Sequence, residues 1–376
     1  MSAQFDVAII GAGLAGLSLA VRLAALPKPP SIVLIDRRNG YSRDRTWCHW
    51  AGSPHPFEGC VSHRWSQWRV GTGEDFSTCV DHSHPYQRIP ADLLYEEAKR
   101  RLAQSAKVEW KLAMQVAKVS RGKNGVIITC EDGSEIAASR VFDSRPPPLD
   151  LACWSQKFRG LEIEVPALRS DIGTVRLMDF QSAGPDGVRF FYVLPLSATS
   201  ALLEDTWLVP PGRQPEFSDA AIMDYAQKHF GTDIGRVTHR EEGSIPMSSI
   251  GRSRTMEPVI RIGTAGGAVR ASSGYAFSRI QQQSQAIAEA FANGQLPPRH
   301  DRILDFFDAI FLGVLEKYPE RMPEYFHRLF ARVPPERLVR FMESRPLPLD
   351  LLAVVRALPP WPFLHATSSL LRNTFG

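Results

Sequence analysis

Residues 5–38 read FDVAIIGAGLAGLSLAVRLAALPKPPSIVLIDRR, and this stretch decides the fold. The run at residues 5–10 is short, apolar and rich in β-branched side chains, which is typical of a buried parallel strand. Leucine and alanine then recur at helical spacing until the prolines of residues 27–30 end the pattern. Residues 31–35 are a second apolar run, and it ends at Asp36. The stretch therefore predicts a strand, a helix and a second strand of an α/β fold.

The break between the first strand and the helix carries the spacing G-x-G-x-x-G. Gly11 makes the tight turn, Gly13 lets the backbone approach a pyrophosphate, and Gly16 lets the helix pack close to the strand. The start of the helix offers free N–H groups and a positive dipole to the phosphates. Asp36 lies 20 residues after Gly16, where a carboxylate accepts hydrogen bonds from ribose hydroxyls. An ordinary glycine turn would need neither the flanking strands nor the acid, so the pattern predicts dinucleotide binding.

The composition of the chain indicates a globular protein with a large core. It has 376 residues, of which 44% are hydrophobic and 22% charged, consistent with one large domain and a second lobe, or with two domains. The net charge of +4 gives no nucleic-acid footprint, although a local basic patch could still touch anionic lipid. The five cysteines show no C-x-x-C spacing and the histidines lack a ligand motif, so neither a disulfide framework nor a metal site is expected.

Two observations place the protein on the cytoplasmic side of a membrane. No signal peptide precedes the first strand, and no window reaches the roughly 18 uncharged apolar residues that a membrane span needs. The C-terminal part, however, carries apolar clusters at residues 303–315, 349–358 and 361–364. We expect these clusters to form either a membrane-facing surface or the helical core of the second lobe.

A second glycine-rich turn lies late in the chain, after an apolar run at residues 259–262 that predicts a strand. Between the two turns, residues 158–210 predict strands with long connections, which indicates an inserted lobe. A plain dehydrogenase has no need of the late turn, whereas a flavoprotein must hold the larger FAD from both sides. The domains expected are a FAD-binding domain (residues 1–55, 86–157 and 243–300), a substrate lobe (56–85 and 158–242) and a helical C-terminal region (301–376).

Motifs outside the glycine turns are more specific. The sequence resembles the bacterial flavin-dependent lycopene cyclases over nearly its whole length. The segments that carry the resemblance include Arg45-Thr46-Trp47, Tyr86-Gln87-Arg88-Ile89, Phe142-Asp143-Ser144-Arg145, Leu203-Glu204-Asp205-Thr206, Gly263-Thr264-Ala265-Gly266-Gly267 and Ser273-Gly274-Tyr275. The chain departs from the family at Arg270, where His or Lys is common, and in Ala271-Ser272-Ser273-Gly274-Tyr275, where the family usually has a Pro-Ser-Thr-Gly-Tyr type string.

The resemblance implies an α/β fold with α+β elements. The expected fold has a Rossmann-like FAD-binding domain of the p-hydroxybenzoate-hydroxylase-like type, an inserted β-rich lobe and a helical C-terminal region. It also implies a non-redox activity that closes the ends of lycopene into β-ionone rings, giving β-carotene through γ-carotene. The expected cofactor is non-covalent FAD in its reduced form, with NAD(P)H as the reductant. Because the substrate is a C40 hydrocarbon taken from lipid, we expect peripheral attachment to the inner face of the cell membrane.

Lycopene cyclisation needs an acid in an apolar pocket, and the resemblance places that acid at Glu204. Strand alternation puts Glu204 and Asp205 on opposite faces, so only one of them points into a given pocket. Burial and any nearby anion raise the pKa of a glutamate and keep it protonated. The alternative is that the two acids form a hydrogen-bonded strand end. If Glu204 is the acid, Asp205 is a structural partner.

The remaining site predictions follow from the two turns and the resemblance. The residues expected to bind the cofactor are Gly11, Ala12, Gly13, Leu14, Ala15, Gly16, Asp36, Arg37, Gly263, Gly266 and Gly267. Trp47, Asp205 and Tyr275 are further candidates for contact with the substrate or its cation, with core packing as the alternative for each aromatic ring.

Two other functions fit the same sequence features. One is a flavin monooxygenase or reductase acting on a polyprenyl or carotenoid substrate; the other is a non-catalytic flavoprotein that binds carotenoid. Flavin hydroxylases and halogenases usually carry Asp where this chain has Thr264 and Pro where it has Ala271, which argues against hydroxylation. Product mass separates cyclisation from oxygenation and reduction, and a non-catalytic flavoprotein would leave lycopene unaltered. Ring type, one ring or two, and NADH or NADPH remain open alternatives.

Overall fold

The N-terminal stretch folds as the sequence predicts, into β1 (Phe5–Ile10), α1 (Leu14–Ala24) and β2 (Ile32–Ile35). Both faces of β1 are covered, which explains why it is apolar throughout. Val7 and Ile9 pack with the helices on one side, while Ala8 and Ile10 pack with a β-meander on the other. The computed structural model describes residues 4–146, 153–168, 171–231, 235–248, 258–296 and 302–375.

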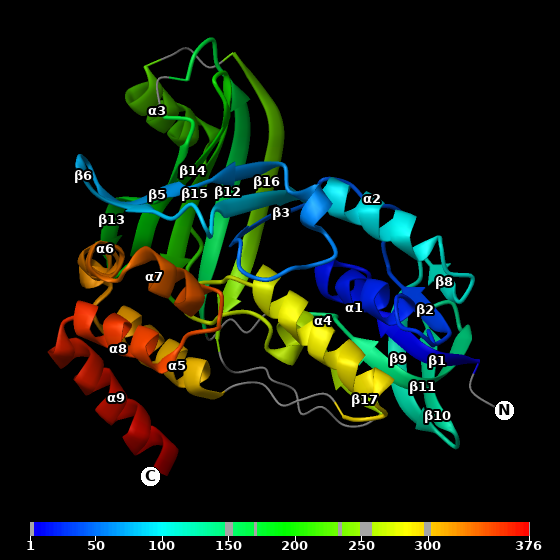
Figure 1. The fold of residues 1–376 in the computed structure, drawn as a ribbon. Helices are drawn as coiled ribbons and strands as arrows, with labels where there is room; N and C mark the ends of the chain where they lie inside the picture. The colour runs from blue at the N-terminus through cyan, green and yellow to red at the C-terminus, as the bar shows by residue number, and fades with distance from the viewer. Residues whose placement is uncertain are drawn as a thin grey trace.

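The first sheet has seven strands, and β1 is its centre. β1 pairs in parallel with β2 and with β11, and β17 pairs in parallel with the end of β11. This pairing confirms that the chain returns to the first lobe just before the second glycine turn. The strand order is β8 (Val108–Lys111), β2, β1, β11 (Glu135–Asp143), β10 (Gly125–Cys130) and β9 (Val116–Gly122), with β17 (Val259–Arg261) beside β11. Helices α1, α2 (Ala91–Leu102) and α4 (Phe277–Ala292) cover one face (Figure 1).

The second sheet also has seven strands, most of them long and antiparallel. The order is β16 (Arg236–Met247), β12 (Trp154–Glu164), β15 (Ser200–Val209), β14 (Gly187–Ser197), β13 (Thr174–Gly184), β5 (Gln67–Thr72) and β6 (Asp75–Val80). Helix α3 (Asp219–Phe230) covers one of its faces, and helices from the C-terminal region pack on the other. Because β12 begins at Trp154 and β16 ends at Met247, the sheet extends past the predicted lobe limits of 158 and 242, and those limits remain a prediction.

A small third sheet links the two larger ones. It consists of β3 (Thr46–Trp50), β7 (Tyr86–Pro90) and β4 (His63–Trp65), in the order β3-β7-β4. Alternation gives it two different faces. Trp47 and Ile89 pack with the core of the first lobe, whereas Trp50 and Tyr86 pack with the core of the second sheet.

The chain ends in a group of short helices, as expected, and proline begins most of them. They are α5 (Arg302–Lys317), α6 (Met322–Arg332), α7 (Pro335–Met342), α8 (Pro348–Ala357) and α9 (Pro360–Phe375). The apolar surface expected on residues 303–315 divides in two: Leu304 and Val314 are buried in the core, whereas Ile303 and Phe306 are exposed. Of the helices described, none is both long enough and apolar enough to cross a bilayer.

Candidate active site

In the first glycine turn, Gly11 and Gly16 lie close to neighbouring atoms, whereas Gly13 faces open space. Gly11 has φ +88°, and its carbonyl accepts a hydrogen bond from the Ser144 hydroxyl at 2.9 Å. A Cβ on Gly16 would lie 2.0 Å from the carbonyl oxygen of Gly11, so any side chain there would collide with the turn. A Cβ on Gly13 would meet no atom within 4 Å. Gly13 therefore faces open space at the start of α1, where a pyrophosphate would lie.

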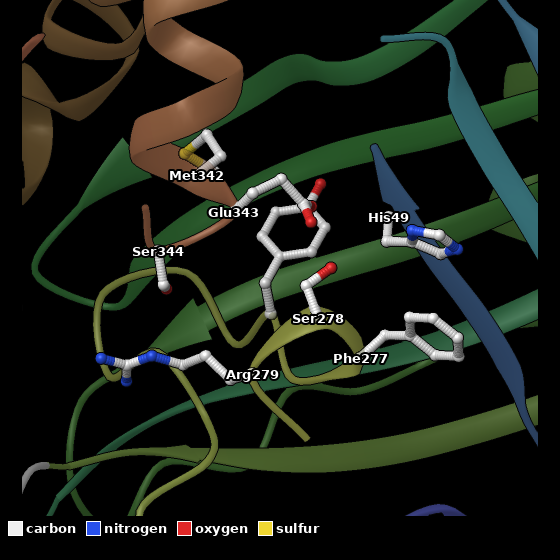
Figure 2. Close-up of a pocket in the computed structure, with 8 residues that line it drawn as sticks. His49, Phe277, Ser278, Arg279, Met342, Glu343 and Ser344 are labelled. Atoms are coloured by element: carbon white, nitrogen blue, oxygen red, sulfur yellow. The ribbon is translucent and has the colours of Figure 1, made fainter. Parts of the chain in front are cut away.

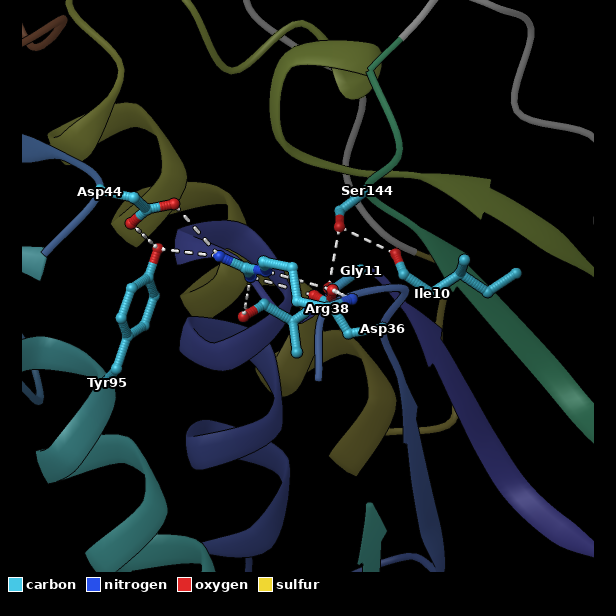
Figure 3. A network of polar contacts seen from close by, with 8 residues as sticks. Ile10, Gly11, Asp36, Arg38, Asp44, Tyr95 and Ser144 are labelled. Atoms are coloured by element: carbon cyan, nitrogen blue, oxygen red, sulfur yellow. Dashed lines mark hydrogen bonds and ion pairs between the residues drawn. The ribbon is translucent and has the colours of Figure 1, made fainter. Parts of the chain in front are cut away.

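Asp36 closes the turn from the end of β2 (Figure 3). Its carboxylate accepts a hydrogen bond from the Ala12 N–H at 2.7 Å and is held by the Arg38 guanidinium at 3.0 Å. Arg38 also donates to the Ala12 carbonyl at 3.0 Å and to the Tyr95 hydroxyl at 3.3 Å. The arginine beside Asp36 is thus Arg38, whereas the predicted Arg37 is exposed. Arg37 and Arg38 are neighbours in the chain, and neighbouring side chains at the end of a strand point in opposite directions. Only Arg38 therefore faces Asp36.

The second glycine turn packs directly on the first. Gly263 has φ +62°, and a Cβ on it would lie 2.8 Å from the Cβ of Ala15. Its N–H donates to the side chain of Gln283 on α4 at 2.8 Å, and Gly267 is also left-handed at φ +77°. The structure therefore brings the two predicted turns together, although they are about 250 residues apart in the sequence.

The residues between these turns and the small sheet fit a large dinucleotide cofactor. His49 and Gln87 form a cross-strand pair on the face of the small sheet that turns toward the first lobe. Among the described residues, His49 Nε2, Gln87 Oε1 and Thr46 Oγ1 are buried without a hydrogen-bond partner. Buried polar atoms normally have partners, so these atoms mark a place for a polar group. Burial also lowers the pKa of His49 to about 4, so its ring is neutral and able to accept or donate.

Glu204 lies in one row of residues that crosses four strands. Gly160 on β12 pairs with Glu204 on β15 and with Glu241 on β16, and Tyr192 on β14 pairs with Glu204 from the other side. Residues in such a row point to the same face of a sheet. Because Gly160 has no side chain, the two glutamates meet above it, and a Cβ there would lie 3.0 Å from the Cγ of each.

This pairing controls the proton affinity of Glu204. Desolvation, and then the charge and hydrogen bond of Glu241, raise the pKa of Glu204 well above its ordinary value, and Arg88 offsets them only in part. Arg88 is buried and forms an ion pair with Glu162 at 2.9 Å, which reduces its effect on Glu204. Two adjacent buried carboxyl groups disfavour the ionisation of both. The pairing therefore favours the protonated form of Glu204.

A line of tyrosines connects this acid to the segment after the second glycine turn. The Tyr192 hydroxyl donates to Tyr86 at 3.1 Å, and the Tyr86 and Tyr275 hydroxyls lie 3.0 Å apart. The Trp50 ring packs against Tyr86 at 4.7 Å and against Tyr275 at 5.3 Å. Tyr192, Glu204 and Tyr275 lie deep in the molecule, and each keeps some accessible surface.

Two other predicted site residues lie away from Glu204 and the tyrosines. Asp205 is fully buried on the opposite face of β15 and forms two hydrogen bonds, of 2.8 and 2.9 Å, with Arg189. Trp47 packs edge-on against Tyr95 in the first lobe, with ring centroids 5.8 Å apart. Contact of Trp47 with the substrate therefore stays a prediction, and alternation along β3 turns Trp50 toward Tyr275.

Arg270 anchors the segment that carries Tyr275. Its guanidinium is fully buried with the carboxylate of Asp308 on α5, at 2.6 to 3.0 Å, and it also donates to the Phe341 carbonyl at 2.7 Å. The Arg270 N–H bonds the Tyr275 carbonyl at 2.9 Å. The residue that departs from the family pattern thus ties the site to the C-terminal helices.

Replacing Asp308 by alanine is expected to lower the free energy of unfolding by about 3–5 kcal/mol, because the Arg270 charge would remain buried and unpaired. Urea denaturation measures this change. The matched control is Glu97→Ala on α2, which breaks surface pairs with Arg100 and Arg101 and should cost less than about 1 kcal/mol. Equal losses in the two variants would show that the buried Arg270–Asp308 pair contributes no more to the free energy of unfolding than a surface pair.

Glu343 is a second buried acid beside the site (Figure 2). Its carboxylate accepts a hydrogen bond from the Trp50 N–H at 3.1 Å, and it lines a cavity of about 10 Å³ with Tyr275 and Ser278. Burial raises the pKa of Glu343 from 4.5 to about 7. The carboxyl group therefore changes charge near neutral pH.

This shift predicts a dependence of stability on pH. Between pH 4.5 and about 7 the folded protein keeps a proton on Glu343 that the unfolded chain has lost. The contribution of Glu343 to stability is therefore complete below pH 4.5 and falls by about 3 kcal/mol as the pH rises through that window. Melting curves at several pH values should show a smaller loss of stability in Glu343→Gln, whereas the exposed control Glu216→Gln should lose as much as the wild type. An unchanged slope in Glu343→Gln would contradict this assignment.

Sequence reasoning missed Glu241, Gly160, the Tyr86–Tyr192 pair and Glu343. Only strand register reveals the first two, because Gly160 and Glu241 are 81 positions apart. Tyr86 stands within a segment that carries the family resemblance, but that segment alone assigned no function to the side chain. Glu343 had no signal in the sequence.

The comparisons agree with this geometry. The structure of a flavin-dependent brominase superposes with a TM-score of 0.62 at 14% identity, covering 98% of this chain and 99% of that chain, so the fold is that of the flavin-dependent oxidoreductases and halogenases. A family model described as lycopene cyclase protein matches residues 6–368. The chain belongs to that family.

Two lycopene beta-cyclases are similar over nearly the whole length. The protein from Paracoccus sp. (strain N81106 / MBIC 01143) is 27% identical, with 95% of each chain aligned. The protein from Pantoea ananas is 24% identical, with 99% of each chain aligned.

Proposed function

We propose that this protein is a carotenoid ring cyclase that converts the ends of lycopene into β-ionone rings. The observation that carries the proposal is the buried Glu204 carboxyl, which the strand register places beside Glu241 across Gly160, in a chain of the lycopene cyclase family. Protonation of an alkene needs a carboxylic acid that keeps its proton at neutral pH, and this pair provides one.

The reaction begins when the Glu204 carboxyl donates its proton to the terminal alkene of the substrate. A tertiary carbocation results, the neighbouring alkene attacks it, and a six-membered ring closes. A proton then leaves the ring carbon and returns to the ionised Glu204–Glu241 pair. One proton enters and one leaves, so substrate and product have the same mass.

The chain's own residues also protect the cation. Trp50 and Tyr275 pack together beside Tyr86, and aromatic faces attract a cation by about 0.5–2 kcal/mol each. Tyr86 and Tyr192 are joined by a hydrogen bond between their hydroxyl groups. Exclusion of water here prevents formation of an alcohol.

We infer that the cofactor is FAD, held by the first glycine turn from Gly11 to Gly16, by Asp36, and by the second turn at Gly263, Gly266 and Gly267. When bound in its reduced form, a flavin supplies an electron-rich surface that stabilises a neighbouring cation. NAD(P)H would serve to reduce it. Arg38 is the more suitable basic residue at the nucleotide end, since it lies beside Asp36.

We also propose peripheral attachment to a membrane through the C-terminal helices. Large apolar side chains are exposed there on α5, α8 and α9, among them Ile303, Leu349 and Trp361. Exposed large apolar side chains on several helices favour an interaction site in this region. A lipid surface would supply the hydrocarbon substrate.

The experiment is incubation of the FAD-loaded protein with lycopene in liposomes, under reducing conditions and without oxygen. We expect cyclic products with the mass of lycopene. A product heavier by one oxygen atom would indicate a monooxygenase, and one heavier by hydrogens would indicate a reductase. Unaltered lycopene with fully reduced flavin would leave a binding protein.

A further inference from the structure

A groove lies between α6, α7 and α8, on the side of the molecule opposite the first sheet (Figure 1). Its volume is about 340 Å³. Three arginines, one from each helix, stand around apolar side chains of α8. The lining residues are Arg332, Arg337, Leu349, Leu352, Ala353, Arg356 and Ala357.

The α8 part of this lining is a single helical stripe. Leu349, Leu352, Ala353, Arg356 and Ala357 follow the spacing i, i+3, i+4, i+7, i+8, which places them on one face. The α8 side of the groove is therefore formed by one face of the helix, and not by side chains spread around it. Pro348 fixes where the helix begins.

The positive charge of the groove is only partly neutralised. Asp350 is buried and held by two hydrogen bonds of 2.8 Å from Arg340, so it has little left for Arg337, whose Nε lies 3.9 Å away. In the described ranges, no carboxylate lies within 4.0 Å of the Arg332 or Arg356 guanidinium. On α7 the acidic residue is Glu336, which is exposed.

Exposed apolar side chains flank these arginines. Leu349 is 61% exposed and Val355 is 55% exposed on α8, and Trp361 is 81% exposed at the start of α9. Leu347 and Leu364 are also exposed. A surface that combines free arginines with exposed leucine and tryptophan is suited to the boundary between lipid head groups and acyl chains.

We propose that the groove binds the phosphate group of an anionic phospholipid, so that α8 lies on the bilayer. This inference rests on the membrane attachment proposed above and names the lipid chemistry and the residues. Arginine matches phosphate oxygens through paired N–H donors, and the apolar rim would bury itself against the acyl chains. An acidic protein partner would satisfy the arginines but leave Trp361 and Val355 without apolar cover.

Each arginine near an anionic bilayer surface should strengthen binding about 5-fold. The triple variant R332Q/R337Q/R356Q is therefore expected to bind anionic vesicles roughly 100-fold more weakly than the wild type. Because Arg337 also donates to the Leu349 carbonyl at 3.3 Å, the double variant R332Q/R356Q keeps that helix contact. It should lose about 10-fold or more.

The test is vesicle flotation of the full-length protein with neutral phosphatidylcholine, alone or mixed with phosphatidylglycerol. The wild type should prefer the anionic vesicles, and salt should weaken that preference. The control K28Q/K118Q/K123Q removes the same charge from exposed sites around the first sheet and should keep the preference. Equal loss in the control would reduce the effect to net charge and overturn the proposal.

Further outcomes separate the remaining occupants. If inorganic phosphate competes with the vesicles at equal phosphate concentration, the groove is a site for free anions. If the wild type does not distinguish the two vesicles and is recovered with an acidic protein, the occupant is a protein, and the lipid assignment is wrong. Flotation does not depend on ring formation, so this inference and the cyclase activity fail separately. In detergent micelles, all variants should keep the wild-type cyclase rate.

Discussion

Replacing Glu204 by glutamine is expected to lower the rate of ring formation by about 10²-fold or more, which is the scale of positioned acid catalysis. Glutamine keeps the size of the side chain and most of its hydrogen bonding, but it has no proton to donate. Glu204→Asp should keep part of the activity, because only the reach of the acid changes. The rates must be compared with fully reduced flavin, so that reduction does not limit the reaction.

The neighbouring acids provide the controls for this result. Glu241→Gln removes the charge that raises the pKa of Glu204, so the activity should fall and its decline with rising pH should begin at lower pH. Asp205→Asn leaves Arg189 without its carboxylate, so it should cost stability rather than turnover. Near-wild-type rates in Glu204→Gln together with an inactive Asp205→Asn would move the acid to the opposite face of β15.

Gly13→Val is expected to give a folded protein that has lost its flavin. A side chain at Gly13 would meet no protein atom within 4 Å, so it would fill the space of the pyrophosphate without disturbing the turn. Flavin absorbance of the purified protein and its melting temperature measure the two effects. Activity should fall below detection, and added FAD should not restore it.

The matched control is Gly184→Val at the end of β13, where a side chain also meets no atom within 4 Å. It should keep both flavin and fold. Gly16→Val should instead fail to fold, because its Cβ would overlap the Gly11 carbonyl. A yellow, active Gly13→Val protein would show that the dinucleotide lies elsewhere.

The parts of the fold that could be predicted are those fixed by local pattern. The stretch from Phe5 to Asp36 combines an apolar run, a glycine spacing and a helical repeat within 32 residues, and the structure has these elements at nearly the predicted bounds. The strand predicted from the apolar run at residues 259–262 is likewise present, as Val259–Arg261. In each of these cases the sequence signal and the structure lie in the same short segment.

The parts that could not be predicted depend on register between distant strands. Glu204 was identified through a motif, but its partner Glu241 becomes visible only when β12 lies between β15 and β16 with Gly160 in the shared row. Trp47 and Trp50 look alike in the sequence, and only the position of β3 between two lobes decides which one reaches Tyr275. Arg37 and Arg38 differ in the same way, through the direction of one strand end.

The central claim is that the protein closes rings by protonation without net redox change, and product mass after reaction in D2O tests it most directly. Anaerobic incubation of lycopene with the protein and reduced FAD should give cyclic products that gain one mass unit for each ring, because the Glu204 proton exchanges with solvent. The same reaction in H2O should leave the mass unchanged. Cyclic product without deuterium, or product carrying an added oxygen atom or two added hydrogens in H2O, would contradict the account.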